Sequence, residues 1–254
     1  MKIFTRKYPV GLALSGGAAR GIAHLGVFRA LNEKKIGVGI ISGSSAGALA
    51  GAFFAEGFAP EEILSIISGK KFYDLVSFTS PRKGFFRVEG LKKILESHLK
   101  TRRIEDLPTP LVICATNFSE GRPEYLTEGP LIDALIASAS IPVLFRITNI
   151  NNVPYIDGGV MDNLPIDPIR DRCRKLIAVH TNPIGQQEDP RNPVQIAERA
   201  FHLSIASKIQ RKKESADIFI EPPELQKFGF LDLKKSKELF KVGYEAAIHA
   251  LSGF

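Results

Sequence analysis

The sequence contains no tryptophan, two methionines and two cysteines among 254 residues. Cys114 and Cys173 each stand alone, which argues against a disulfide framework or a metal site and indicates a reducing compartment. The chain also lacks any apolar run near the ~20 residues that span a bilayer. The apolar part of residues 1–17 is too short for a cleavable signal peptide. We therefore expect a cytoplasmic location, and peripheral contact with a membrane stays open.

Length and composition favour one large globular domain over residues 1–254. Hydrophobic residues make up 44% of the chain and charged residues 24%, which is enough for a sizeable core and excludes a disordered chain. No internal repeat, low-complexity segment or long linker divides the sequence. The formal net charge of +7 admits nucleic acid, anionic lipid or acidic substrates as partners and does not choose among them.

The sharpest chemical signal is a G-x-S-x-G motif formed by Gly43, Ser45 and Gly47. A β-branched run at 38–41 predicts a buried strand before it, and small apolar residues at 48–54 predict a packed helix after it. A strand, a tight turn with a central serine and a helix are typical of a nucleophile elbow. Side chains at the two glycines would collide with backbone, and the serine hydroxyl would be lifted above the sheet near the positive helix end. A plain Gly/Ser turn is the alternative.

A glycine-rich loop at 15–21 lies between an apolar strand at 10–14 and a helical pattern at 22–34. Together with the elbow this makes a βαβα run, which predicts an α/β fold with a parallel sheet. Because Ala18 replaces a glycine and no Gly-Lys-Ser/Thr follows, the loop matches neither a dinucleotide fingerprint nor a phosphate loop. The amides of Gly16, Gly17 and Ala18 could form an oxyanion hole. An ordinary tight turn is the alternative.

Asp157 ends an apolar strand at 153–156 and is followed by two glycines. This placement suits a functional site, although an Asx-turn would look the same. Ligands of parallel sheets bind at the carboxyl ends of the strands, so we expect the glycine-rich loop, Ser45 and Asp157 to converge there. Asp157 could then act as the base for Ser45 directly, or it could orient a histidine.

His180 is the histidine, among five in the chain, that ends a strand after Asp157. The order Ser45, Asp157, His180 matches that of α/β-hydrolases, which keeps a Ser-His-Asp carboxylesterase as an alternative. Ser45 stands only two strands into the chain, whereas an α/β-hydrolase elbow normally comes after several more strands. This early position argues against the triad.

These motifs resemble those of bacterial patatin-like phospholipases. Ser-Gly-Gly-Ala-Ala-Arg-Gly at 15–21 resembles the family's oxyanion loop, Gly-Ser-Ser-Ala-Gly at 43–47 its elbow, and Ile-Asp-Gly-Gly at 156–159 its Asp-Gly-Gly/Ala motif. Stretches at 137–142 and 161–165 also resemble family segments, in the family's order. One departure is Ala18, where the family often has glycine. Its N–H can still donate, but its Cβ narrows the backbone conformations open to it.

The resemblance implies a three-layer α/β/α fold with a mainly parallel central sheet, and a serine acyl hydrolase. Ser45 and Asp157 would form a catalytic dyad without histidine, and the amides of Gly16, Gly17 and Ala18 would hold the oxyanion. The residues expected to support these motifs are Arg20, Gly21, Gly43, Gly47, Gly158 and Gly159. Arg20 would either position the loop or meet a phosphate, with plain solvent exposure as an equal alternative.

The implied substrates are acyl esters such as phospholipid, lysophospholipid or neutral lipid, with no metal or organic cofactor and no nucleic-acid partner. A non-catalytic lipid-binding module with the same fold is a second alternative to the dyad enzyme. Residues 70–87 interleave basic and aromatic side chains, which suits transient contact with a membrane surface. The alternative for this segment is a surface loop whose aromatic rings fold back onto the core.

Overall fold

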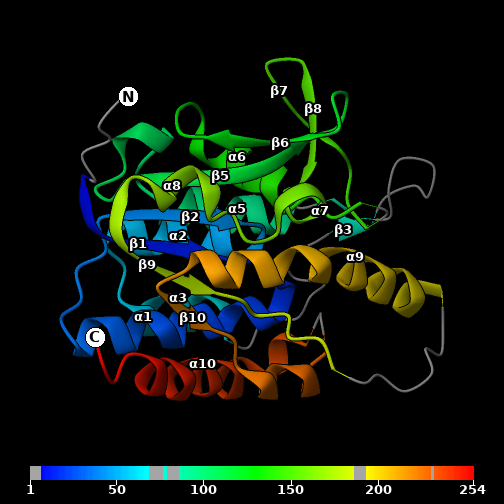
Figure 1. The fold of residues 1–254 in the computed structure, drawn as a ribbon. Coiled ribbons are helices and arrows are strands. Elements are labelled where there is room, and N and C mark those ends of the chain that lie inside the picture. The colour runs from blue at the N-terminus through cyan, green and yellow to red at the C-terminus, as the bar shows by residue number, and fades with distance from the viewer. Residues whose placement is uncertain are drawn as a thin grey trace.

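A computed structural model describes residues 7–68, 77–78, 86–87, 89–142, 144–185, 193–229 and 232–254. Within this part of the chain an eight-stranded sheet runs in the order β10-β9-β1-β2-β5-β8-β7, and β6 pairs with β5 (Figure 1). Its strands are β1 (Tyr8–Leu14), β2 (Ile40–Ser44), β5 (Leu111–Asn117), β6 (Arg122–Leu126), β7 (Thr148–Ile150), β8 (Val153–Asp157), β9 (Cys173–Val179) and β10 (Ile218–Ile220).

Helices cover both faces of this sheet. The α-helices are α1 (Ala23–Glu33), α2 (Ala46–Glu56), α3 (Pro60–Ile67), α5 (Glu89–His98), α6 (Leu131–Ser138), α7 (Gly159–Asp162), α8 (Asp167–Arg170), α9 (Pro193–Ser215) and α10 (Ser236–Ala250). Short 3-10 segments are η1 (Ala18–Ile22), η3 (Ile104–Asp106), η4 (Pro223–Lys227) and η5 (Leu233–Lys235).

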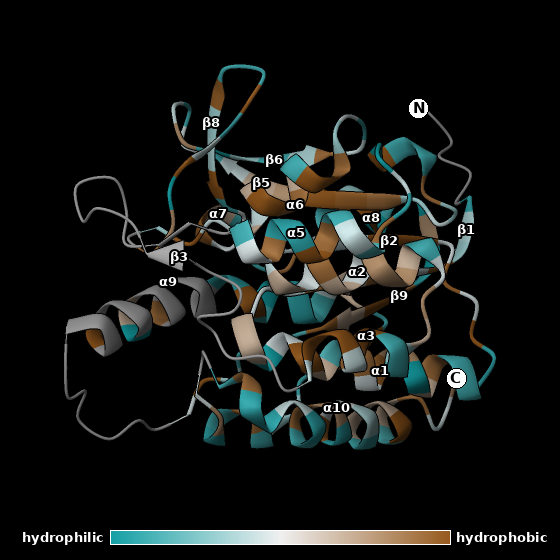
Figure 2. Ribbon diagram, turned by 180° about the vertical axis from the view of Figure 1, so that it is seen from behind, coloured by the Kyte–Doolittle hydropathy of each residue, from teal (hydrophilic) through white to brown (hydrophobic). Residues whose placement is uncertain are grey.

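Successive side chains along each strand point to opposite faces of the sheet, so the core packs in two layers, one on each face. Leu12 and Leu14 of β1 point into the larger cluster, with side chains from α1, α2, α3, α5, α6 and α10. Ala13 points to the opposite face and joins the smaller cluster, to which Ile169 of α8 and Ile209 of α9 contribute. Figure 2 shows the apolar residues concentrated in the central strands and alternating with hydrophilic residues along α10. The result is a three-layer α/β/α fold, as expected.

The sheet is mainly parallel, since β10, β9, β1, β2 and β5 run in one direction. β6 and β8 flank β5 in the antiparallel sense, and β7 completes a hairpin with β8. The sequence pattern predicts the first strand of this hairpin at 145–147, but in the structure that strand is Thr148–Ile150. Asn151 and Asn152 both have positive φ, 49° and 64°, so a two-residue turn brings the strand up to residue 150.

Of residues 70–87, the structure describes only the backbone of β3 (Ser77–Phe78) and β4 (Phe86–Arg87), which pair in the antiparallel sense. The hypothesis of a lipid-contacting flap therefore concerns residues outside the described part of the chain. None of the described helices combines the length and the hydropathy needed to cross a bilayer. Cys114 and Cys173 are both buried and free.

Candidate active site

Ser45 occupies a sharp turn between β2 and α2. Its backbone has φ 51° and ψ −121°, a conformation that costs a non-glycine residue about 1–3 kcal/mol. A Cβ on Gly43 would lie 2.6 Å from the carbonyl carbon of Gly47, and a Cβ on Gly47 would lie 2.4 Å from the Leu14 oxygen. The turn is therefore as tight as the motif requires, and neither glycine position has room for a side chain.

The turn brings the Ser45 hydroxyl to Asp157. Ser45 Oγ donates to Asp157 Oδ2 at 2.6 Å, and the Gly159 amide donates to the other carboxylate oxygen at 2.7 Å. Both residues are buried, with Ser45 6% and Asp157 2% exposed. The nucleophile candidate thus lies against a carboxylate in a protected position and not at the open surface.

Burial dominates the electrostatics of this carboxylate. It raises the pKa of Asp157 from an ordinary value of 3.8 to about 6, and the hydrogen bonds from Ser45 and Gly159 oppose a further rise. A group whose pKa lies near the working pH is well matched to accept a proton and return it. The site therefore holds a serine hydroxyl in contact with a carboxylate whose pKa is raised to about 6.

The strand that carries Asp157 runs in a direction that the sequence pattern does not predict. β8 runs antiparallel to β5, and Asp157 lies opposite Ala115 instead of at the carboxyl edge of a parallel strand. The neighbouring residue Cys114 pairs with Ser44 of β2, so the register places Asp157 beside the elbow. Convergence with Ser45 was expected, but the antiparallel entry was not.

Ser138 at the end of α6 is a supporting residue that the motifs did not single out. Its hydroxyl accepts the Ser45 backbone N–H at 2.8 Å and donates to the Cys114 carbonyl at 2.6 Å. It therefore ties the strained turn to the neighbouring strand β5. The only signal in the sequence was the resemblance of 137–142 to a family stretch.

The glycine-rich loop lies beside the elbow but offers fewer free donors than expected. The Gly16 amide donates to the Asn163 carbonyl at 3.0 Å, so this N–H is already engaged. Among the described residues, the amides of Gly17 and Ala18 have no hydrogen-bond acceptor. Ala18 has φ 44°, in the region where its Cβ causes strain and glycine does not. Two of the three expected donors are thus available.

Two side chains brace the loop from behind. His24 Nε2 lies 2.8 Å from the Ser15 carbonyl, and because burial lowers the pKa of His24 to about 4, the neutral ring donates this bond. Arg20 Nε donates to the Phe228 carbonyl at 2.9 Å. Of the two roles considered for Arg20, this contact favours positioning of the loop.

His180 does not approach Asp157. Its Nδ1 lies 2.7 Å from Glu221 Oε1. Within the described part of the chain, the two oxygens of Asp157 are bonded to Ser45 and Gly159. The structure therefore brings Ser45 and Asp157 together without the third member of a Ser-His-Asp arrangement.

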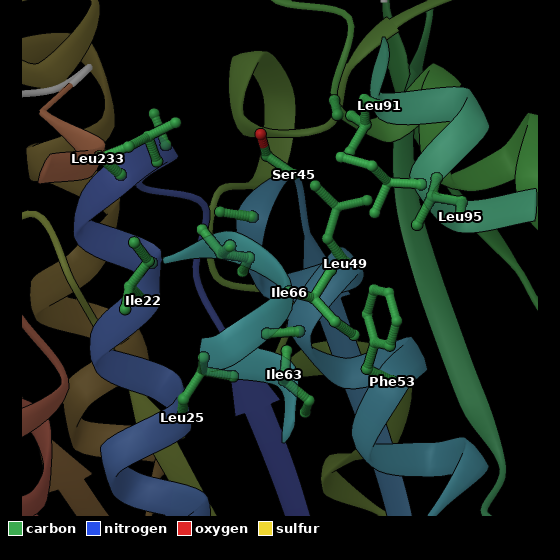
Figure 3. Close-up of a pocket in the computed structure, with 18 of the residues that line it drawn as sticks. Ile22, Leu25, Ser45, Leu49, Phe53, Ile63, Ile66, Leu91, Leu95 and Leu233 are labelled. Carbon is green, nitrogen blue, oxygen red and sulfur yellow. The ribbon is translucent and has the colours of Figure 1, made fainter. Parts of the chain in front are cut away.

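A cavity of about 170 Å³ opens beside Ser45. In Figure 3, Ser45 lies at one end and Leu25, Phe53 and Ile63 lie at the other. The 3-10 segment η1 and helices α2, α3 and α5 supply most of the walls, and apart from Ser45 every described lining residue is glycine or apolar. The cavity can therefore accept an unbranched apolar group whose reactive end lies at the serine. No group of three or more His, Cys, Asp or Glu side chains among the described residues could hold a metal ion.

The sequence has clear relatives. Residues 12–170 match the model of a family described as patatin-like phospholipase. Lysophospholipase NTE1 of Kluyveromyces lactis is 26% identical over 267 residues, which cover 92% of this chain and 18% of the relative. An uncharacterised NTE family protein of Mycobacterium tuberculosis is 33% identical over 184 residues, which cover 71% of this chain and 51% of the relative. The chain thus spans about a fifth of the length of the yeast relative and half of the mycobacterial one.

The fold has a solved counterpart. The crystal structure of VipD from Legionella pneumophila matches with a TM-score of 0.54 at 15% identity, over 97% of this chain and 67% of that one. At this identity the likeness concerns the fold alone. The match to the family model establishes more than the fold, because residues 12–170 make up more than half of the chain and include the glycine-rich loop, the elbow and Asp157. The chain belongs to the patatin-like phospholipase family.

Proposed function

We propose that this chain is a serine acyl hydrolase that cleaves ester bonds of phospholipids or related lipids. The observation that carries the proposal is the 2.6 Å contact between the Ser45 hydroxyl and Asp157 at the end of an apolar cavity. A buried base in contact with an oxygen nucleophile is the arrangement that nucleophilic catalysis requires. Membership of the patatin-like phospholipase family agrees with this chemistry.

The reaction proceeds through an acyl-enzyme. Ser45 Oγ attacks the ester carbonyl carbon while its proton passes to Asp157, and the carbonyl oxygen becomes an oxyanion. The amides of Gly17 and Ala18 donate to that oxyanion. The bond to the alcohol then breaks, and the alcohol takes the proton from Asp157. A water molecule then attacks the carbonyl carbon of the acyl-enzyme while Asp157 takes its proton. The bond to Ser45 Oγ breaks, Ser45 recovers the proton from Asp157, and the carboxylic acid is released.

The cavity points to the acyl group as the part of the substrate that is recognised. Its volume of about 170 Å³ lies below the roughly 300–1,000 Å³ of typical small-molecule pockets, which favours a single acyl chain. The relatives from Kluyveromyces lactis and other fungi are named lysophospholipases. We therefore expect a monoacyl phospholipid to be a better substrate than a diacyl one.

The decisive test is labelling with a fluorophosphonate and mapping of the labelled peptide. We expect a single adduct on Ser45. Ser45→Ala should lose the label and lower kcat for a soluble ester such as p-nitrophenyl butyrate by about 10⁴-fold or more. Ser65→Ala, on the exposed face of α3, is the matched control and should behave as the unmodified chain. Substantial turnover by folded Ser45→Ala protein would refute the assignment.

The same experiment separates the two alternatives. A non-catalytic lipid-binding module would show no labelling and no turnover in the unmodified chain. A Ser-His-Asp esterase would lose activity in His180→Ala as completely as in Ser45→Ala. For the dyad we expect His180→Ala to keep most of its activity, because His180 is bonded to Glu221 and not to Asp157.

A further inference from the structure

A group of charged side chains around a buried Asp162–Lys212 ion pair lies where α9 crosses α7, outside the site described above. Asp162 ends α7, and the Lys212 ammonium on α9 lies 2.9 Å from its Oδ1 and 3.0 Å from its Oδ2. The Tyr125 hydroxyl donates to Oδ2 at 2.8 Å. Asp167 completes the group, with its Oδ2 3.0 Å from Lys212. Lys212 and Lys213 give this helix a basic last turn, and no local sequence pattern indicates that Lys212 is largely buried between two carboxylates.

The segment that carries Asp162 is hydrogen-bonded to both halves of the proposed catalytic machinery. α7 begins at Gly159, whose amide holds one oxygen of Asp157 at 2.7 Å. The residue after α7 is Asn163, whose carbonyl accepts the Gly16 amide of the glycine-rich loop at 3.0 Å. A displacement of α7 would therefore disturb the base and the oxyanion loop together.

Four residues of helix have no stability of their own, so α7 is held in place by its contacts, and those of Asp162 are the ones that involve a buried charge. Burial raises the pKa of Asp162, and the charge of Lys212 and the hydrogen bonds from Lys212 and Tyr125 oppose that rise. The ionisable groups that face this carboxylate are Lys212 from α9, Tyr125 from β6, Cys114 from β5 and Asp167 from α8. Lys208 of α9 lines the same pocket, and its ammonium donates to the Met161 carbonyl at 3.0 Å.

Lys212 is the cation of this group, and its removal would leave a buried carboxylate unpaired. An unpaired buried charge is strongly unfavourable. The carboxylate would either turn toward water, pulling α7 with it, or take up a proton. These two responses differ in their pH dependence, which makes the role of Lys212 measurable.

We propose that Lys212 is a positioning residue of the hydrolase: by pairing with Asp162 it holds α7, and through α7 it holds both Asp157 and the glycine-rich loop in place. The inference rests on the proposed function. It assigns to α9 a task that neither the motifs nor the cavity requires, which is to fix the catalytic geometry from the opposite face of the sheet.

The test compares Lys212→Met with the unmodified chain in hydrolysis of p-nitrophenyl butyrate. At about pH 8 we expect kcat to fall by about tenfold or more while KM changes less than about twofold. As the pH is lowered from this value, protonation of the unpaired Asp162 removes the buried charge, so the ratio of variant to unmodified kcat should rise at least about threefold. The titration of Asp157 is followed separately, from the full pH–rate profile of each protein, because a displaced Gly159 amide would also change the pKa of Asp157.

Three variants complete the design. Lys212→Arg keeps the charge and should retain most of the activity. The double variant Asp162→Asn with Lys212→Met has no unpaired charge at this position. Its kcat should therefore be close to that of the unmodified chain, and the ratio of the two kcat values should not change with pH. Arg211→Met, at an exposed neighbouring position, is the matched control and should leave kcat unchanged. If Lys212→Met does not fold, Lys212→Gln, which keeps a donor toward Asp162, takes its place in the same measurement.

Either of two results would overturn the proposal: unchanged kcat in Lys212→Met at about pH 8, or a loss of the same fraction at every pH. A purely structural role would give a loss of kcat that matches the loss of folded protein at each pH, so far-UV circular dichroism of both proteins is recorded under the conditions of the assay. Failure of the proposed function is distinguishable, since it would appear as undiminished turnover in Ser45→Ala whatever Lys212→Met does.

Discussion

Replacement of Asp157 by asparagine should remove activity and at the same time stabilise the fold. The amide cannot take the Ser45 proton, so we expect hydrolysis to fall by several powers of ten. Its shape, however, fits the site. Its oxygen can accept the Gly159 amide and its NH₂ group can donate to Ser45 Oγ, which then becomes the acceptor. The variant keeps both contacts of the carboxylate without burying a charge.

The size of the stabilisation follows from the pKa. Burial raises the pKa of Asp157 from 3.8 to about 6, and a pKa difference of one corresponds to about 1.4 kcal/mol. The folded chain binds this proton more tightly than the unfolded chain does. Ionisation therefore costs the folded state about 3 kcal/mol above the folded pKa, and the cost disappears as pH falls toward the unfolded value.

Denaturant unfolding followed by far-UV circular dichroism measures this difference, and it suits a chain without tryptophan. At about pH 8 the free energy of unfolding of Asp157→Asn should exceed that of the unmodified chain by up to about 3 kcal/mol. At about pH 5 roughly half of the difference should be left, because the carboxyl is then protonated in the folded chain. A variant that is less stable at about pH 8, or a difference that does not shrink on acidification, would refute the reasoning about buried charge.

Three further outcomes are expected. The kcat/KM for a short-chain ester should rise with pH through an apparent pKa of about 6, because Asp157 must be ionised to act as base; full activity at about pH 4.5 in a pH–rate profile would contradict this role. Ala18→Gly should change the free energy of unfolding by less than about 1 kcal/mol, since relief of strain at φ 44° is offset by a more flexible unfolded chain, and kcat should stay within about threefold. Ala50→Leu, which fills part of the cavity, should lower turnover of p-nitrophenyl palmitate by about tenfold or more and spare p-nitrophenyl butyrate; an equal change with both esters would argue against the cavity as the acyl site.

Local sequence pattern predicts the elements around the elbow, and the motifs predict that Ser45 and Asp157 lie close together. The run at 38–41, the G-x-S-x-G turn and the small apolar helix after it predict the β2–elbow–α2 unit, because tight turns restrict residue types strongly. The patatin-like resemblance and the three-layer fold are confirmed by the family match and by the structure. The expected contact of Ser45 with Asp157 is present as a hydrogen bond, and its catalytic role stays a prediction.

Long-range hydrogen bonds account for what the sequence could not predict. The Gly16 amide is engaged by Asn163, which is 147 positions away in the chain, and no local signal shows that this donor is used. Ser138 supports the elbow through its hydroxyl, yet a serine at a helix end has many other uses. Asp157 enters on an antiparallel strand, and strand direction is set by pairing partners that periodicity does not reveal.

Asp157 and Asp162 are five positions apart in the chain, and their long-range partners give the two carboxyl groups different surroundings. Burial raises the pKa of both Asp157 and Asp162. Only hydrogen bonds from Ser45 and Gly159 oppose the rise at Asp157, so this carboxylate can take up a proton near neutral pH. At Asp162 the charge of Lys212 opposes it, which favours an ionised anchor. Pairs of carboxyl groups whose surroundings differ in this way are typical of sites where one group transfers protons and the other does not. The placement of a single lysine on α9 therefore sets the surroundings of Asp162 apart from those of Asp157.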